Sequence, residues 1–112
     1  MKISFLITLF GLALPAFSQA GSELYIPSDS QAKYTVINKR GSKKMPTLTT
    51  KRVGSSGVNY SKRLFDCKAR TTKYLGTGDT MKEMKASMPD PKMSMIIDGS
   101  IADYQWKYAC NR

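Results

Sequence analysis

The chain contains no histidine, and it has only two cysteines and one tryptophan among its 112 residues. Without histidine there are no Ser-His-Asp or Cys-His nucleophiles, no imidazole acid–base catalysis and no histidine metal ligands. The acidic residues are scattered, with no spacing that predicts a catalytic carboxylate pair. We therefore do not expect an enzyme, and no motif predicts a cofactor or a metal.

Long apolar runs are also absent, apart from one near the start, at residues 3–14. This run is shorter than the ~20 residues that a membrane-spanning helix needs. It follows the basic Lys2 and precedes the small residues Ser18 and Ala20, which is the layout of a secretory signal cleaved after Ala20. We expect residues 1–20 to be a signal peptide and the mature protein to be exported, either periplasmic or at the cell surface, with no transmembrane segment. The alternative is an uncleaved membrane anchor.

The two cysteines, Cys67 and Cys110, are expected to form a disulfide. A mature domain of residues 21–112 buries only a modest core and is often reinforced covalently. Two cysteines in an exported chain are the usual means of doing so. Closing the long loop between them contributes about 4 kcal/mol in the chain-entropy model. The alternative is a pair of unlinked thiols.

The chain order predicts a flexible N-terminal arm at residues 21–32 and a single small α+β domain at residues 33–112. Within the domain, residues 33–39 and 48–53 are rich in β-forming residues and predict a hairpin. Residues 60–75 form the longest strand candidate. In that segment, period-two counting places four side chains on the buried face: Phe65, Cys67, Ala69 and Thr71.

The C-terminal third predicts one ambiguous segment, one short strand and one helix. Residues 80–88 fit either a helix, with Thr80 as a possible N-cap, or a turn that leads into a strand. Residues 93–97 predict a short strand. Ser100 resembles an N-cap of a helix that ends near Cys110. The fold class we expect is α+β, a small antiparallel β-sheet covered by a C-terminal helix that the disulfide links to it.

The positive charge is concentrated in one half of the chain. Residues 33–73 contain twelve lysines and arginines against a single acid, Asp66, whereas residues 74–112 contain five of each sign. A one-sided cationic field favours anionic partners. The alternative is a basic surface that is merely solvated.

Four pairs of adjacent cations account for much of this charge, and we take them as the candidate polyanion-binding residues. Neighbours in a strand point to opposite faces, so a pair deep inside a half-buried strand would bury one charge at a high cost. We therefore expect the pairs to lie at strand ends and turns, around the rim and open face of the sheet. The eight residues are Lys39, Arg40, Lys43, Lys44, Lys51, Arg52, Lys62 and Arg63.

Three short segments carry a resemblance to a known family. They are F-D-C-K-A-R at residues 65–70, G-T-G-D at 76–79, and D-G-S-I-A…W-K-Y-A-C at 98–110. Their pattern resembles the surface-adhesin protein E-like family of small exported bacterial proteins, over roughly residues 61–110. The resemblance implies an antiparallel sheet with a disulfide-anchored helix and, for a few members, adhesion to host extracellular proteins.

We expect a non-enzymatic exported binding or adhesion protein that uses a cationic face to engage a macromolecule. A polyanionic glycan, an anionic envelope component or a host extracellular protein is the expected partner, and nucleic acid is not. One alternative is a structural envelope protein with no ligand on the basic face. The other is a small cationic nuclease-like enzyme, which the lack of histidine disfavours.

Overall fold

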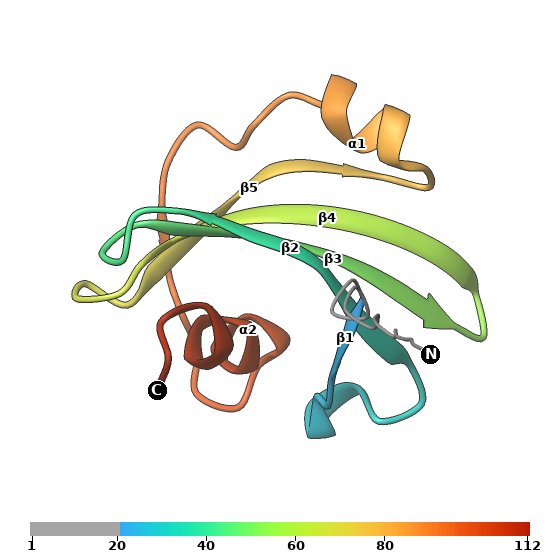
Figure 1. The fold of residues 1–112 in the computed structure, drawn as a ribbon, viewed down its shortest axis with the longest axis horizontal. Coiled ribbons are helices and arrows are strands. Elements are labelled where there is room, and N and C mark those ends of the chain that lie inside the picture. Colours follow the sequence, from blue (N-terminus) through green and yellow to red (C-terminus); the bar gives the residue numbers. More distant parts are fainter. Residues whose placement is uncertain (1–20) are drawn as a thin grey trace, which may run out of the picture.

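Residues 21–112 form one antiparallel sheet with a helix on each face. The structure, a computed structural model, describes these residues, so the expected signal peptide at residues 1–20 lies outside the described part. Six strands pair in the order β1-β2-β3-β4-β5-β6, each with the next along the chain. Figure 1 shows α1 on one side of the sheet and α2 on the other. The bounds are β1 Ser22–Leu24, β2 Lys33–Gly41, β3 Pro46–Gly54, β4 Gly57–Asp66, β5 Thr71–Gly78, α1 Met81–Ala86, β6 Ser94–Met95 and α2 Ile101–Ala109.

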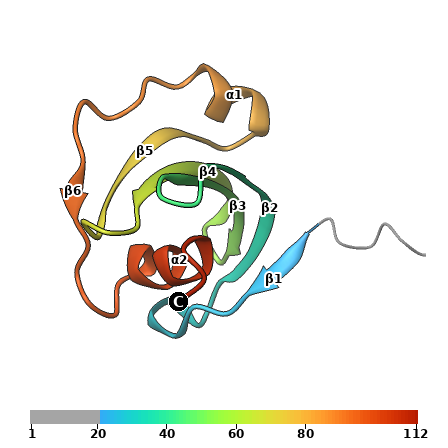
Figure 2. The ribbon, with the colours of Figure 1, turned by 60° about the vertical axis from the view of Figure 1, so that its left-hand side comes forward.

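The sheet curves around α2 (Figure 2), and we call the face toward α2 the inner face and the face toward α1 the outer face. The core lies between the inner face and α2, where Leu48 and Phe65 of the sheet are buried in one cluster with Trp106 and Ala109 of the helix. Burial of a side chain such as Leu48 or Phe65 stabilises the fold by about 1.5–3 kcal/mol. The expected α+β sheet with a covering C-terminal helix is confirmed.

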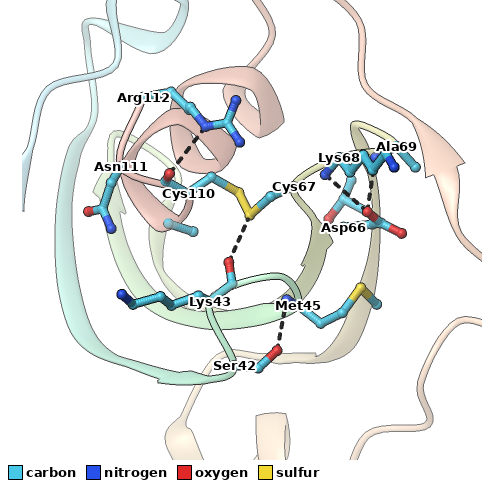
Figure 3. Close-up of a disulfide and its surroundings, with 12 residues drawn as sticks. Ser42, Lys43, Met45, Asp66, Cys67, Lys68, Ala69, Cys110, Asn111 and Arg112 are labelled. Atoms are coloured by element: carbon cyan, nitrogen blue, oxygen red, sulfur yellow. Dashed lines mark hydrogen bonds between the residues drawn. A yellow bond between two sulfur atoms is a disulfide. The ribbon is translucent and has the colours of Figure 1, made fainter.

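The disulfide between Cys67 and Cys110 is present and joins the end of β4 to the end of α2. Cys67 also donates its backbone N–H to the Lys44 carbonyl oxygen at 3.0 Å. Its Sγ atom lies 3.5 Å from the Lys43 carbonyl oxygen (Figure 3). The β2–β3 turn, the end of β4 and the end of α2 are therefore held at one point.

The predicted hairpin of residues 33–39 and 48–53 is confirmed as β2 and β3, each slightly longer than expected. The prediction of one long strand over residues 60–75 is wrong. The segment contains the ends of two paired strands, β4 and β5, joined by a tight turn. Phe65 and Cys67 are buried as expected, but Ala69 is exposed and Thr71 is half-buried.

The segment expected to be a flexible arm, residues 21–32, differs from that expectation because it forms an edge strand and a short 3-10 turn. β1 pairs with β2, with Ser22 opposite Val36. The 3-10 turn follows at Pro27–Asp29, directly after Ile26, which is only 2% exposed. Leu24 and Ile26 therefore pack on the domain, whereas Tyr25 is exposed.

Residues 80–88, for which the sequence predicts either a helix or a turn that leads into a strand, contain the helix α1. Thr80 caps it by accepting a hydrogen bond from the Glu83 N–H at 3.1 Å. The helix lies against β5, where a Cβ atom added to Gly76 would be 2.2 Å from the Met84 carbonyl oxygen. Only glycine at this position lets the helix approach the strand so closely.

The predicted strand at residues 93–97 is reduced to β6, two residues long, paired with the start of β5. Ser100 is the N-cap of α2, as predicted, and accepts a hydrogen bond from the Asp103 N–H at 3.2 Å. Within residues 21–112, no helix has the length and apolarity needed to cross a membrane. The disulfide is typical of an oxidising compartment outside the cytoplasm.

Candidate functional site

Six of the eight cations of the four basic pairs are divided between the two faces of the sheet, and Lys43 and Lys44 lie on the β2–β3 turn. The expectation that all pairs lie at strand ends and turns is wrong for two of them. Lys51-Arg52 lies within β3 and Lys62-Arg63 lies near the middle of β4. Because strand neighbours point in opposite directions, each pair sends one cation outward and one inward. The inward cations are tolerated because each has a specific partner.

Lys39 contacts the end of α2. Its Nζ atom donates to the Ala109 carbonyl oxygen at 3.4 Å and to Asn111 Oδ1 at 3.3 Å. It also lies 5.7 Å from the centroid of the Tyr108 ring. A cation beside the last carbonyl groups of a helix stabilises the negative end of the helix dipole. Lys39 therefore helps to hold α2, which is a structural role.

Arg52 forms an ion pair with Asp29, with Nε donating to Oδ2 at 2.7 Å and Nη2 to Oδ1 at 3.2 Å. Tyr34 donates its hydroxyl to the same carboxylate at 2.7 Å. The hydrogen bonds from Arg52 and Tyr34 lower the pKa of Asp29. Burial, together with the bond to Asp29, raises the pKa of Tyr34 to about 12. Residues 21–32, which the sequence predicts to be a flexible arm, thus supply the counter-ion for the inward-facing Arg52.

Arg63 is the inward cation without an acidic partner. Its Nη2 atom donates to the Tyr74 hydroxyl at 2.7 Å, and its guanidinium carbon lies 4.0 Å from the centroid of the Tyr74 ring. Within the described residues it forms no ion pair, and its buried Nε atom has no hydrogen-bond acceptor. Burial lowers the pKa of the guanidinium, although the group remains charged.

The outward cations gather on the outer face, and we call this group the outer cationic face. Cross-strand pairing places Arg40, Thr47, Leu64 and Lys73 in one row across the sheet. Within residues 21–112 none of the cations in the group forms an ion pair with a carboxylate. The group consists of Lys33, Arg40, Lys51, Lys62 and Lys73, with Lys43 and Lys44 on the adjoining β2–β3 turn.

Strand geometry gives the size of the outer cationic face. Neighbouring strands lie about 4.8 Å apart and residues rise about 3.3 Å along a strand, so the cations span roughly 14 Å across the sheet and 23 Å along it. Lys51, Lys62 and Lys73 are half-buried, whereas Lys33 and Arg40 are exposed. The face is thus broad and shallow, and its charge density suits an extended polyanion.

A groove lies on this face between the sheet and α1. It has a volume of about 370 Å³, and its lining includes Arg40 and Lys62 from the sheet and Lys85 from α1. The polar side chains of Asn38 and Thr49 line it as well, and no carboxylate does. Three cations of separate elements therefore converge on one concave site.

A second cleft, of about 580 Å³, lies on the inner face beside α2. Its walls include Arg63 and Tyr74 from the sheet and Gln105 from the helix, and the Arg52–Asp29 ion pair also lines it. Among residues 21–112, no group of three or more acidic or cysteine side chains lies close enough together to hold a metal ion. Polar side chains and tyrosines therefore define the chemistry of this cleft.

The sequence prediction missed several residues of both sites. Lys33 and Lys73 are single cations, and only strand register reveals that they share a face with the paired ones. Lys85 belongs to the charge-balanced half of the chain, and the packing of α1 brings it to the groove. No local signal marked Gln105, because its position depends on how α2 docks.

Comparisons with protein-family models, with curated proteins and with solved structures found no match to this chain. The chemistry of the side chains on the two faces of the sheet is therefore what indicates a function.

Proposed function

We propose that the mature protein is a non-enzymatic, exported binding protein whose outer cationic face engages an anionic macromolecule, with a polyanionic glycan as the partner. The observation that carries the proposal is the absence of any ion pair at the seven cations of this face within the described residues. Like charges held together on one face repel each other and oppose folding. A polyanion relieves that repulsion and releases its own condensed counter-ions on binding.

The groove beside α1 supports the same proposal. Arg40, Lys62 and Lys85 give it a net positive charge, while Asn38 and Thr49 supply hydrogen-bonding groups for the sugar or linker between anionic groups. Export agrees with the disulfide and with the expected signal at residues 1–20. The expected resemblance to surface-adhesin E-like proteins agrees with a surface role, and it remains a prediction.

The test measures binding of the mature protein to heparin, used as a probe polyanion, over a range of salt concentrations. We expect steep weakening with salt, because each anionic group that a cation neutralises releases counter-ions. The double variant Arg40→Glu/Lys62→Glu should lower the slope of log K against log salt by roughly one for each of the two cations replaced.

The matched control is Lys92→Glu/Arg112→Glu, which changes the net charge equally at exposed positions outside the strands and the turn that form the outer cationic face. Lys85 is unsuitable as a control because it lines the groove. The control should keep most of the wild-type slope. An equal loss of slope in the two double variants would show that only net charge matters. Elution of the wild type from a heparin column near physiological salt would disprove the proposal. A structural envelope protein with no ligand on the basic face is expected to elute near physiological salt.

A further inference from the structure

The inner-face cleft has the dimensions and lining of a small-molecule site, separate from the outer cationic face. Its volume of about 580 Å³ falls in the range of roughly 300–1,000 Å³ that is typical of ligand pockets. It lies between the curved sheet and α2, with Ile101 and Gln105 of the helix on one side and Tyr34 and Tyr74 of the sheet on the other. An extended polymer on the outer face would not reach it.

Gln105 is an unpartnered polar side chain that lines this cleft. It is only 2% exposed. Among the hydrogen bonds of the described residues, its side-chain amide makes none. The amide atoms are not among the fully buried polar atoms that lack a partner, so they reach the open space of the cleft, where a ligand can pair with them. The neighbouring core positions of α2, Trp106 and Ala109, meet apolar groups, whereas Gln105 presents one acceptor and two donors to the cleft.

Arg63 supplies the positive charge of the inner-face cleft that is available to a ligand. One of its five N–H groups is used by the Tyr74 hydroxyl, and the flat guanidinium stacks on the Tyr74 ring, which fixes its orientation. No carboxylate of the described residues pairs with it. A fixed, partly desolvated guanidinium without a counter-ion is a preorganised site for an anion.

The rest of the cleft limits the charge of the ligand. At its other end Arg52 and Asp29 neutralise each other at 2.7 Å. Asp79 also lines the cleft, as an exposed carboxylate. The lining thus carries two positive and two negative charges, and Arg63 is the cation that no ion pair of the described residues neutralises, an arrangement that favours a singly charged anion over a doubly charged one.

We propose that this cleft binds a small molecule with one carboxylate group, which pairs with the Arg63 guanidinium, and with hydroxyl or amide groups that hydrogen-bond to Gln105. The guanidinium matches a planar carboxylate through two parallel N–H···O bonds. Asn59 and Ser61 continue the polar wall along β4 beyond Arg63, within the same cleft. A ligand with several hydroxyl groups, such as a sugar acid, fits such a wall.

The experiment titrates the mature, disulfide-bonded protein with acetate, with glucuronate, and with glucose as the neutral match of glucuronate. Nuclear magnetic resonance reports the Arg63 Nε–H signal and the Gln105 side-chain amide signals directly. We expect saturable shifts of both for glucuronate, weaker saturable shifts of the Arg63 signal for acetate, and none for glucose. Inorganic phosphate and sulfate serve as competing anions and should bind more weakly than glucuronate.

Two variants test the assignment, each checked for folding by the dispersion of its spectrum. Arg63→Gln should weaken glucuronate binding about tenfold or more, because it removes a charge-assisted hydrogen bond. Gln105→Glu places a negative charge on the same wall and should weaken binding while leaving Arg63 intact. The outer-face variant Arg40→Gln removes one charge away from the cleft and should bind glucuronate as the wild type does.

The absence of saturable shifts with either carboxylate would overturn the proposal. So would unchanged glucuronate affinity in Arg63→Gln and Gln105→Glu, or binding of phosphate and sulfate as tight as that of glucuronate. Failure of heparin binding at the outer face would leave these results unaffected, because the two sites share none of the residues changed.

Discussion

At the scale of single residues, the buried carboxylate of Asp103 connects three parts of the chain. It lies within α2, and its side chain is 3% exposed. Arg70 of the β4–β5 turn donates to Oδ1 at 2.6 Å, the Gly99 N–H donates to Oδ2 at 2.9 Å, and Lys107 lies at 3.5 Å. Burial alone would raise the pKa of Asp103, but the Gly99 hydrogen bond and the two cations outweigh it, so the pKa is lowered.

We predict that Asp103→Asn destabilises the protein by about 2 kcal/mol at neutral pH, since it leaves Arg70 with only the exposed Asp98 as an ionic partner. Urea unfolding measures this change. Asp98→Asn is the matched control and should cost less than about 1 kcal/mol, because its side chain is 91% exposed. Equal costs for the two variants would contradict the role of Asp103.

At the scale of secondary-structure elements, the hairpin of β4 and β5 shows where prediction from sequence fails. The turn between these strands, residues 67–70, has no glycine, proline or asparagine. It forms because Asp66 Oδ1 accepts hydrogen bonds from the backbone N–H groups of Lys68 and Ala69, and because Arg70 adopts a φ of 58°. An aspartate that accepts hydrogen bonds from the residues after it is a turn signal. The alternating residues of this segment also fit one continuous strand, so the turn was not predicted.

Other elements were predictable because their signals are local. The β2–β3 hairpin has a turn with glycine at Gly41, where φ is 83°. The helix α2 has its N-cap serine, and its end coincides with Cys110. The groove beside α1 and the inner-face cleft could not be predicted, because they depend on register and on how α1 and α2 dock. A one-residue change of register would move every inward cation to the outer face.

The attachment of α2 gives an element-scale prediction. Cys110→Ser should lower the free energy of unfolding by about 2–5 kcal/mol, as expected for removing a native disulfide from a small domain. Because Cys110 is the C-cap of α2, this destabilisation should be accompanied by faster hydrogen exchange in α2 than in β3 and β4. The double variant Cys67→Ser/Cys110→Ser, which leaves no unpaired thiol, should match the single variant. Unchanged stability in both would contradict the prediction.

At the scale of the whole molecule, ionisable groups set the pH range of stability. The pKa values of Asp29 and Asp103 are lowered from 3.8, so the folded state keeps both carboxylates charged at a pH where the unfolded chain binds protons. The stability that they provide is complete above about pH 4 and is lost as the pH falls through the folded-state values. Tyr34 acts in the opposite direction. Its pKa is raised from 10.0 to about 12, so the stability that it provides is lost as the pH rises.

We predict that the free energy of unfolding falls below about pH 4 and again between about pH 10 and pH 12, where the unfolded tyrosine ionises before the folded one. Urea unfolding across the pH range measures the profile. Tyr34→Phe should reduce the alkaline loss, with a lower stability at neutral pH because Asp29 loses a hydrogen bond. An alkaline loss equal to that of the wild type would show that another group titrates.

The sequential order of the strands has a consequence for the order in which the chain can assemble as it is made. Each strand from β2 to β6 pairs with the strand made just before it, so most of the sheet can form before the end of the chain is made. Cys67 must wait for a partner 43 residues further on. The disulfide can therefore close only late, on a sheet that is already largely paired when Cys110 becomes available. With no other cysteine in the sequence, no isomerase is needed to correct the pairing.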